Sequence, residues 1–344
     1  MQICYLGEAS SVHVRRWASW FARRGHEVDL LSLVGGEVPG VRVHVLPFTG
    51  SGALAFPRKV SQVRRAVANL RPDLLHSHQA VGYGLWGALA RRHPFVVSAW
   101  GSDVLVRPKE SWAQGRVLRF VLRRADYCIP VARHLQESMV PFGLRTDRSQ
   151  AIPMGVELDA YPPLAFRRGS RPPSFISTRA LEPLYDVETL VRASREILAA
   201  NPEIRGTIFG GGSRRTGLEA LACRLGVADR LRFEGPQPPG RVMNALASAR
   251  VYVSTSRSDG ASVSLLEAMA RGCFPVVTNI PANREWIVHG DNGFLFPVGD
   301  AQVLAARVLE VLGDEGFLER ASEKNVQAVR ERGDLNVNLA RVEG

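Results

Sequence analysis

The sequence is poor in cysteine and has no long run of apolar residues. Four cysteines occur in 344 residues, at positions 4, 128, 223 and 273, and no two of them form a C-x-x-C pair. This spacing excludes a disulfide framework and a cysteine-based zinc site, so we expect each cysteine to be a small core residue. No stretch of 18 or more apolar residues is present, and the first residues carry no signal-peptide pattern. These absences predict a cytoplasmic protein, with peripheral contact at the inner face of the cell membrane left open.

Acidic residues are scarce in one half of the chain. The whole sequence has 44 basic and 33 acidic residues, and residues 1–163 hold 21 of the basic but only 12 of the acidic ones. A basic surface is typical of proteins that bind nucleic acid, an anionic membrane or an anionic small substrate, and it also occurs for solubility alone. No zinc-finger, helix-turn-helix or RNA-recognition signature accompanies the arginines, so we expect no nucleic-acid partner.

What is present is a dense alternation of short apolar runs and longer amphipathic runs. A chain of this length exceeds one usual hydrophobic core, so two domains are expected. In the first half the predicted strands are Gln2–Leu6, Val28–Leu33, Val41–Leu46, Leu74–His76, Phe95–Ala99, Tyr127–Pro130 and Ala151–Pro153. The predicted helices between them are Ser11–Arg24, Arg58–Leu70, Gly82–Arg92, Trp112–Arg124 and Ala132–Phe142. This alternation predicts parallel strands with helices on both faces, because a parallel crossover needs a returning helix.

The same pattern restarts after the Pro162-Pro163 pair and a linker rich in Arg, Gly and Pro. The predicted strands here are Ser174–Ser177, Arg205–Phe209, Leu231–Phe233, Val251–Val253 and Phe274–Val277. The predicted helices are Asp186–Ala200, Arg214–Leu225, Pro239–Ser248, Ser262–Arg271, Ala301–Leu312 and Phe317–Arg330. We therefore predict an α/β protein with two doubly wound Rossmann-like domains, 1–163 and 164–330, facing across a cleft, and a tail at 331–344 that crosses back to the first domain. In such sheets, ligands bind beyond the carboxyl ends of the strands.

Glycine is sparse where a dinucleotide site would need it. The loop after the first predicted strand, Gly7-Glu8-Ala9-Ser10-Ser11, has one glycine instead of three, which excludes a nicotinamide-binding fingerprint. The triplet Gly210-Gly211-Gly212 follows another predicted strand but lacks the Gly-Lys-Ser/Thr of a P-loop. It is either a flexible turn or a place where the backbone approaches a ligand, and its position before a helix favours the second.

The most informative segment runs from Ser256 to Gly272, where a polar loop leads into a helix. Free backbone N–H groups at this helix start would form an anion site, contributed by Gly260, Ala261, Ser262, Val263 and Ser264. Glu267 lies roughly 7 Å further along, at about 1.5 Å per residue, where it can accept hydrogen bonds from ribose hydroxyls. Asp259, before the helix, would reach the other end of the same ligand. Two carboxylates flanking an anion site suit a nucleotide sugar, although an isolated acid pair of this spacing is more often a helix cap and a solvated face.

This segment resembles the C-terminal motif of the retaining GT-B glycosyltransferases of family 4, the group 1 glycosyl transferases. In that motif two acids separated by seven residues precede Ala-Met-Ala-x-Gly, and Asp259 stands where the family usually has a glutamate. Further similar segments follow in the family's order: Arg23–Val28, Pro72–His78, Ile152–Asp159, Phe209–Ser213, Phe233–Gly235, Asn292–Phe296 and Gly299–Asp300. Each match is weak alone, but together they cover almost the whole chain.

The resemblance implies that the C-terminal domain binds a UDP- or GDP-sugar and the N-terminal domain an acceptor. Arg179 matches the arginine that contacts the donor diphosphate, so the candidate catalytic residues are Arg179, Asp259 and Glu267. The candidate donor contacts are Gly210, Gly211, Gly212, Gly235 and residues 260–264. The implied reaction moves a hexosyl group to an acceptor hydroxyl with retention, in the synthesis of a glycolipid, polysaccharide or other glycoconjugate. We expect no metal and no cofactor, because no Asp-x-Asp or His/Cys cluster is present and the departing diphosphate would itself take the acceptor proton.

Two departures from the family pattern bear on activity. The residues after Arg179 lack the lysine that is the family's second diphosphate ligand. Helix N-termini, Tyr185 and Arg257 either cover this missing charge or leave donor binding weak, so the alternative is a non-catalytic or weakly active nucleotide-sugar-binding protein. In the first half, Trp100 replaces the usual histidine and either stacks on a sugar or packs in the core. The acceptor-side candidates are Ser10, His13, His78, Trp100 and Asp103.

The basic excess would then lie in the half that receives the acceptor. Two basic segments stand out, Val14–Arg24, where arginines alternate with Trp and Phe, and Arg58–Arg65. Such a composition is typical of a surface that rests on anionic lipid headgroups. We therefore expect contact with an anionic membrane or an anionic, lipid-linked acceptor, with simple solubility as the alternative.

Overall fold

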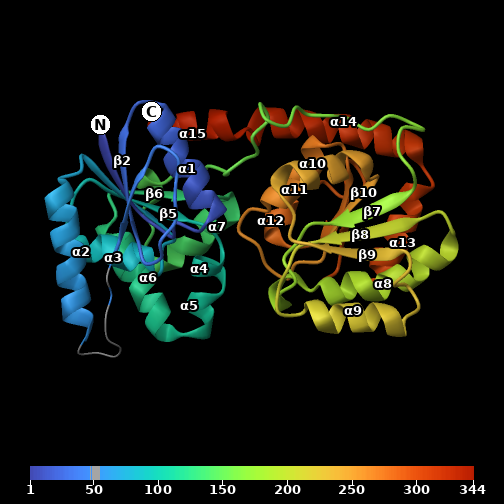
Figure 1. Ribbon diagram of the computed structural model, residues 1–344, viewed down its shortest axis with the longest axis horizontal. Coiled ribbons are helices and arrows are strands. Elements are labelled where there is room, and N and C mark those ends of the chain that lie inside the picture. Colours follow the sequence, from blue (N-terminus) through green and yellow to red (C-terminus); the bar gives the residue numbers. More distant parts are fainter. Residues whose placement is uncertain (47, 49–54) are drawn as a thin grey trace. The chain divides into compact units, whose positions relative to one another are not determined.

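The computed structural model describes residues 1–46, 48 and 55–344, which divide into two compact units (Figure 1). Unit 1 comprises Met1–Pro153 together with Leu339–Gly344, and unit 2 comprises Met154–Asn338. The division falls at Pro153, upstream of the Pro162-Pro163 pair, and the last residues of the chain are grouped with unit 1. There the carboxylate of Glu343 pairs with Arg24 at 3.0 Å and with His26 at 2.8 Å.

The described part of unit 1 builds a six-stranded parallel sheet in the order β3-β2-β1-β4-β5-β6. Its strands are β1 (Gln2–Leu6), β2 (Glu27–Ser32), β3 (Arg42–Val45), β4 (Leu74–His78), β5 (Phe95–Ala99) and β6 (Tyr127–Pro130). Its helices are α1 (Val12–Arg23), α2 (Phe56–Leu70), α3 (Tyr83–Ala90), α4 (Ser102–Leu105), α5 (Arg107–Glu110), α6 (Trp112–Arg124) and α7 (Arg133–Met139). The strand order reverses between β1 and β4, which is the doubly wound arrangement.

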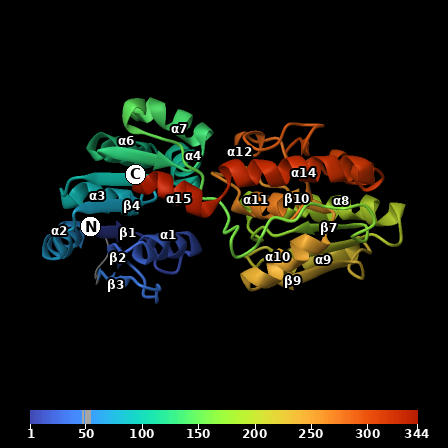
Figure 2. The same cartoon turned by 90° about the horizontal axis from the view of Figure 1, so that it is seen from above.

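Helices cover both faces of this sheet. Helix α3 contacts both α2 and α6. Figure 2 shows α2 and α3 on the opposite side of the strands from α1. The residues of α1 that face the sheet recur with helical spacing and are buried: Val14, Trp17, Ala18 and Phe21. The predicted strand Ala151–Pro153 is wrong. The N–H of Ile152 donates to Pro130, but Pro153 has no N–H to extend the pairing, and the segment stays outside the sheet.

The described part of unit 2 repeats the architecture with strand order β12-β11-β10-β7-β8-β9. Its strands are β7 (Ser174–Ser177), β8 (Arg205–Phe209), β9 (Leu231–Gly235), β10 (Val251–Ser254), β11 (Phe274–Thr278) and β12 (Phe294–Phe296). Its helices are α8 (Val187–Ala200), α9 (Arg215–Arg224), α10 (Pro239–Ser248), α11 (Val263–Ala270), α12 (Pro281–Arg284), α13 (Ala301–Leu312) and α14 (Glu315–Arg332), and α15 (Leu335–Glu343) runs on into unit 1. The order reverses between β7 and β10, so the prediction of two Rossmann-like sheets is confirmed.

Two apolar cores, one on each face, hold the second sheet in place. On one face Val187, Leu190 and Leu304 belong to a buried cluster from α8 and α13, and on the other Met243 and Leu265 belong to a cluster from α10 and α11. Figure 1 shows α8, α9 and α13 on one side of the strands and α10, α11 and α14 on the other. All five residues of β11 are buried, as expected for a strand covered on both faces.

Some local expectations need correction. Cys223 is exposed on α9, whereas the other three cysteines are buried as expected, and all four are free thiols. The short helices α4, α5 and α12, strand β12 and the tail helix α15 were not among the predicted elements. Among the described residues, no helix combines the length and the apolar character needed to cross a bilayer.

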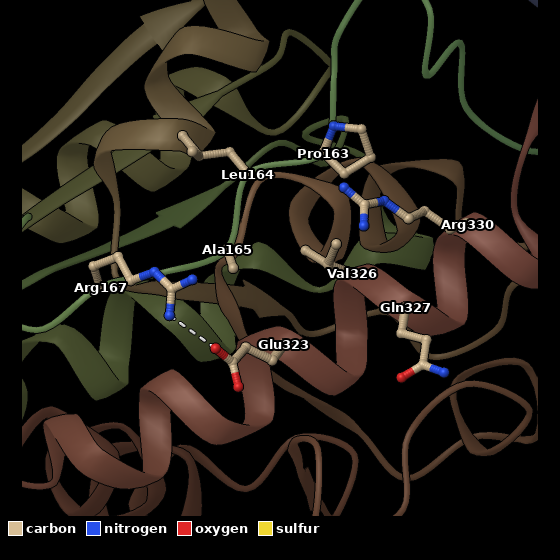
Figure 3. Close-up of a pocket in the computed structure, with 8 residues that line it drawn as sticks. All are labelled: Pro163, Leu164, Ala165, Arg167, Glu323, Val326, Gln327 and Arg330. Atoms are coloured by element: carbon tan, nitrogen blue, oxygen red, sulfur yellow. Dashed lines mark hydrogen bonds and ion pairs between the residues drawn. The ribbon is translucent and has the colours of Figure 1, made fainter.

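The segment that leads into β7 borders a hollow of about 500 Å³ against α14. Figure 3 shows Pro163, Leu164, Ala165 and Arg167 on one side of it and Glu323, Val326, Gln327 and Arg330 on the other. Arg167 closes one end of this hollow through a 2.8 Å ion pair with Glu323. Pro163, Leu164, Ala165 and Arg167 all precede β7 in the chain. The hollow therefore does not lie at the carboxyl ends of the strands, where a doubly wound sheet binds its ligand.

Candidate functional site

The predicted donor residues gather where the strand order of unit 2 reverses. Strands β7 and β10 are neighbours in the sheet, although β8 and β9 separate them in the chain. Arg179 follows the end of β7, and Asp259 follows the end of β10. The loops that follow two neighbouring strands at such a point diverge to opposite faces of the sheet and leave a ligand-sized crevice. The predicted residues therefore stand at the position that this fold reserves for its ligand.

The guanidinium of Arg179 is the centre of the candidate site. Its Nη2 donates to Asp259 at 2.6 Å, and its Nη1 donates to the hydroxyls of Ser262 at 3.1 Å and Ser264 at 2.7 Å. The ring of Tyr185 lies against it, with its centre 4.3 Å from Cζ. These contacts fix a residue that is only 9% exposed as a whole, and they aim its planar donors at the start of α11.

Burial and pairing act in opposite directions on Arg179. Burial disfavours the charged guanidinium, but the negative charge of Asp259 outweighs it, with smaller effects from Tyr252 and Tyr185, and the pKa of Arg179 is raised. Its Nε is buried and has no hydrogen-bond partner among the described residues, and the same holds for the hydroxyl of Ser177. Unsatisfied buried polar atoms are uncommon in native proteins, so this orphaned donor marks a place where a ligand acceptor would be stabilised.

The start of α11 offers fewer free amides than the sequence predicts. Ser262 is the N-cap rather than part of the first turn, and its hydroxyl accepts from Leu265 N–H. The N–H groups of Gly260 and Val263 are engaged within the loop, by Asp259 and Ala261 respectively. Within the described chain this leaves the N–H groups of Ala261, Ser262 and Ser264 without an acceptor. Free amides at a helix start and a guanidinium group are both donors that commonly bind phosphate oxygens.

Glu267 is the fifth residue of α11 and is partly exposed. Its distance along the helix from Ser262 agrees with the prediction from the sequence. Asp259, by contrast, is committed to Arg179, with its side chain 15% exposed. The two carboxylates are therefore in different situations, one on an accessible helix position and one inside an ion pair.

The glycine triplet has a packing role that the sequence did not reveal. Gly210 and Gly212 have φ values of 112° and 155°, and a Cβ at either would lie about 2.5 Å or less from the carbonyl oxygen of Arg179 or Leu181. Leu181 N–H donates to Gly211, and Gly210 N–H donates to Gly235. The glycines thus let the loop after β8 lie directly against the loop that carries Arg179.

The residues expected to replace the missing lysine have partners of their own. Arg257 pairs with Asp186 at 2.9 Å, and Tyr185 lies on Arg179. Arg214, at the edge of the same region, faces Glu188 at 3.5 Å. Of these residues, Asp186, Glu188, Arg214 and Arg257 border a groove of about 320 Å³. The positive charge here is consequently balanced within the chain, and a diphosphate would have to compete with carboxylates for it.

The acceptor-side candidates His78, Trp100 and His13 come together in unit 1. His78 ends β4, and its ring lies 5.2 Å from Tyr5 and 5.0 Å from Trp100, centre to centre, while His13 lies 5.6 Å from Trp100. His78 is 1% exposed, and neither ring nitrogen has a hydrogen-bond partner among the described residues. Burial, with smaller effects from His76 and His13, holds the pKa of His78 well below its usual range. Trp100 is half-buried in this aromatic cluster, and its Nε1 is buried without a hydrogen-bond partner among the described residues.

The other two acceptor-side candidates are held differently. Asp103 is 2% exposed, and its carboxylate accepts from the N–H groups of Ala80 at 2.6 Å, Gly101 at 2.8 Å and Trp100 at 3.1 Å. This geometry fixes the loop that carries Trp100, and burial raises the pKa of Asp103. Ser10 is exposed, and its hydroxyl donates to Glu8.

The first basic segment does not form the surface expected from its composition. In α1 the aromatic side chains are core residues, with Trp17, Trp20 and Phe21 exposed by 2%, 6% and 4%. They cannot rest on lipid while they fill the space against the sheet. What remains exposed on α1 is mainly arginine.

Ser264 was predicted from the sequence only for its backbone amide, and Tyr252 and Asp186 were not predicted as site residues at all. The hydroxyl of Ser264 contacts both Arg179 and Tyr252, the latter at 2.9 Å, and Asp186 positions Arg257. The serine-rich loop was a visible signal, but which hydroxyls point at the arginine depends on how β7 and β10 pair. No cluster of three or more metal-ligating side chains occurs in the described part of the chain.

Comparison with known proteins identifies the family. Residues 165–328 match the family model described as Glycosyl transferases group 1, and residues 2–131 match one described as Glycosyl transferase 4-like. The chain is 28% identical to a phosphatidyl-myo-inositol mannosyltransferase of Mycolicibacterium smegmatis, covering 91% of this chain and 84% of that protein. It is 26% identical to a D-inositol 3-phosphate glycosyltransferase of Nocardia farcinica, covering 90% and 78% respectively.

A solved structure gives the same fold. Anabaena HepE in complex with UDP-glucose superimposes with a TM-score of 0.84 at 19% identity, covering 100% of this chain and 98% of that one. The two family models together span most of both units, and the solved structure has the same fold. The chain belongs to the group 1 family of glycosyltransferases, with the two Rossmann-like domains of the GT-B fold.

Proposed function

We propose that this protein transfers a hexosyl group from a UDP- or GDP-sugar to a hydroxyl of an anionic or lipid-linked acceptor, with retention of the anomeric configuration. The observation that carries the proposal is the buried Arg179, whose guanidinium lies beside free amides at the start of α11, a set of donors suited to phosphate oxygens. The relatives support the acceptor class, since their names include phosphatidyl-myo-inositol and inositol 3-phosphate. A HepE structure that contains UDP-glucose supports the donor class.

In the proposed reaction the bond between the sugar C1 and the diphosphate oxygen breaks, and a bond from C1 to the acceptor oxygen forms on the same face. The acceptor proton passes to the departing phosphate oxygen, so no side chain has to act as nucleophile or base. Arg179 and the amides of Ala261, Ser262 and Ser264 would stabilise the charge that develops on the diphosphate. Glu267 would hold the ribose, and we propose that no metal takes part.

The test compares donor binding with transfer. UDP-glucose, UDP-N-acetylglucosamine and GDP-mannose are screened for thermal stabilisation, since a ligand at about 100 times its Kd adds about 2.7 kcal/mol. The stabilising donor is then used in a transfer assay with phosphatidylinositol, with and without EDTA. We expect Arg179→Lys to weaken both binding and transfer, because a lysine lacks the planar fork, and Arg195→Ala, an exposed change on α8, to alter neither. Donor binding without any transfer or hydrolysis would instead support the non-catalytic alternative.

A further inference from the structure

Helix α6 of unit 1 carries an arginine-rich face with an exposed tryptophan. Trp112, Arg116, Arg119 and Arg123 follow one another at intervals of three or four residues and so share one side of the helix. The buried residues of α6 are Leu118, Val121 and Leu122, which lie on the other side. Together with Phe120 and with Phe142 from the turn after α7, the four exposed residues form what we call the α6 face. They border a shallow groove of about 700 Å³.

The apolar part of the α6 face is unusually open to solvent. Trp112 is 77% exposed, more than any other large apolar side chain among the described residues. The guanidinium of Arg116 lies 5.6 Å from the centre of its ring. Gly115 has no side chain, and a Cβ there would come within 3.3 Å of Phe142, so the glycine keeps the groove open between the two aromatic rings. Val140, in the adjoining turn, is 48% exposed. Exposed apolar surface of this kind commonly marks a contact site.

The charge of the α6 face is not balanced within the chain. Among the described residues, Arg116, Arg119 and Arg123 form no ion pair, although Arg119 donates to the carbonyl of Pro141 at 3.5 Å, and α6 contains no acidic residue. The nearby α5 adds Arg107 and Lys109 and the single acid Glu110. Some helix arginines of unit 2 do have such a partner, since Arg192 pairs with Glu188 and Arg307 with Glu310. The three guanidinium groups of the α6 face therefore remain available to an anionic partner.

We propose that the α6 face binds the surface of an anionic phospholipid bilayer. Tryptophan prefers the boundary between headgroups and acyl chains, and guanidinium groups bind phosphate oxygens in pairs. Arg116 and Arg123 are separated by about 10 Å along the helix at about 1.5 Å per residue, which fits several headgroup phosphates better than one soluble phosphate. The helix lies flat on the surface with Trp112 as its apolar anchor. This inference is independent of the proposed transfer reaction, because it concerns binding that needs neither donor nor acceptor.

The first experiment measures binding to vesicles with a charge-matched control. Full-length protein is sedimented with phosphatidylcholine vesicles that contain about 30% phosphatidylglycerol, and with phosphatidylcholine alone, at about 0.05 M and about 0.5 M salt. The triple variant Arg116→Gln, Arg119→Gln and Arg123→Gln should bind the anionic vesicles at least about tenfold more weakly than wild type. The control variant Arg15→Gln, Arg23→Gln and Arg65→Gln removes the same charge from exposed positions of α1 and α2, and it should bind within about twofold of wild type.

The second experiment asks whether Trp112 enters the bilayer. Brominated phosphatidylcholine in the anionic vesicles should quench part of the intrinsic fluorescence of the wild type, and Trp112→Phe should lose this quenching while keeping the same melting temperature. Equal loss of binding in the two triple variants would overturn the proposal, because it would show an effect of net charge alone. Absence of wild-type binding at low salt, or quenching that persists in Trp112→Phe, would also overturn it. Displacement of the vesicles by a short DNA duplex bound to the α6 face would replace the lipid partner with a nucleic acid.

Discussion

Arg179 donates a 2.6 Å hydrogen bond to Asp259, so the arginine that would bind a diphosphate already has a carboxylate partner within unit 2. The pair is largely buried, and the two side chains are 10% and 15% exposed. A diphosphate that reaches Arg179 must share the guanidinium with this carboxylate or displace it. The pair therefore sets how strongly the site attracts an anion.

The first prediction concerns Asp259→Asn. Removal of the negative charge should tighten the binding of UDP or GDP by at least about fivefold, or ~1 kcal/mol, because the phosphate no longer competes with a carboxylate. The protein without nucleotide should melt at a lower temperature, since Arg179 loses its buried counter-charge. Titration calorimetry and thermal melts measure the two effects. The control Asp229→Asn, at an exposed position of unit 2, should change neither, and weaker nucleotide binding in Asp259→Asn would contradict the prediction.

The second prediction concerns Glu267→Gln on α11. Because a carboxylate accepts hydrogen bonds from ribose hydroxyls more strongly than an amide, transfer should fall at least about tenfold in kcat/KM. The melting temperature should stay unchanged, because the side chain is partly exposed. The matched variant Glu196→Gln, exposed on α8, should retain full activity. Undiminished transfer by Glu267→Gln in a radiolabelled assay would remove Glu267 from the site.

The third prediction uses two glycines of unit 2 with opposite surroundings. Gly210→Ala places a Cβ 2.5 Å from the carbonyl oxygen of Arg179 at a φ of 112°, so it should destabilise unit 2 by about 1–3 kcal/mol and weaken nucleotide binding. Gly217→Ala lies within α9 with nothing within 4 Å of the added Cβ. It should be neutral or stabilise by up to about 1 kcal/mol. Thermal melts with and without UDP distinguish the two, and similar behaviour of both variants would count against the packing role of Gly210.

The fourth prediction concerns the pH dependence of stability. Burial lowers the pKa of His76 to about 3 and that of His78 well below its usual 6.5, so both rings are neutral in the folded protein. The unfolded chain binds these protons below about pH 6.5, so stability is intact above that pH and falls by about 1.4 kcal/mol per pH unit for each ring as the pH decreases. The variant His78→Phe removes one of the two rings that take up a proton on unfolding. It also removes two buried ring nitrogens that have no hydrogen-bond partner among the described residues.

This variant should therefore melt at the same or a higher temperature at pH 7.5 and lose less of its melting temperature than wild type at pH 5. The exposed His289→Gln in unit 2 serves as the comparison and should keep the wild-type pH dependence. An unchanged pH slope in His78→Phe would show that His78 is not the group that takes up the proton on unfolding.

The sequence predicted most of the framework and only part of the site. Strand and helix alternation was sufficient for both sheets, because apolar runs such as Phe274–Val277 and the Gly and Pro boundaries are local signals. The position of Glu267 within its helix also followed from local spacing. The Arg179–Asp259 ion pair did not, because the two residues are 80 positions apart and meet only through the pairing of β7 with β10.

The sequence also did not show which side chains are buried. Trp17, Trp20 and Trp112 all stand among arginines in the sequence, yet the first two are core residues and the third is 77% exposed. Composition records the neighbours along the chain, whereas burial depends on which side of the helix faces the sheet. The proposed contact with lipid is therefore placed on α6, where the tryptophan is exposed, and not on α1, where both tryptophans are buried.

The grouping of Leu339–Gly344 with the first unit has a consequence for how the chain is made. Unit 1 is discontinuous, and Glu343 contacts Arg24 and His26, which are synthesised more than 300 residues earlier. On the ribosome the first sheet can form early, but this closing contact has to wait until the second sheet has been translated. A fragment that stops at Pro153 would leave the histidine and the arginine without their carboxylate, so the two halves are not separable by a single cut.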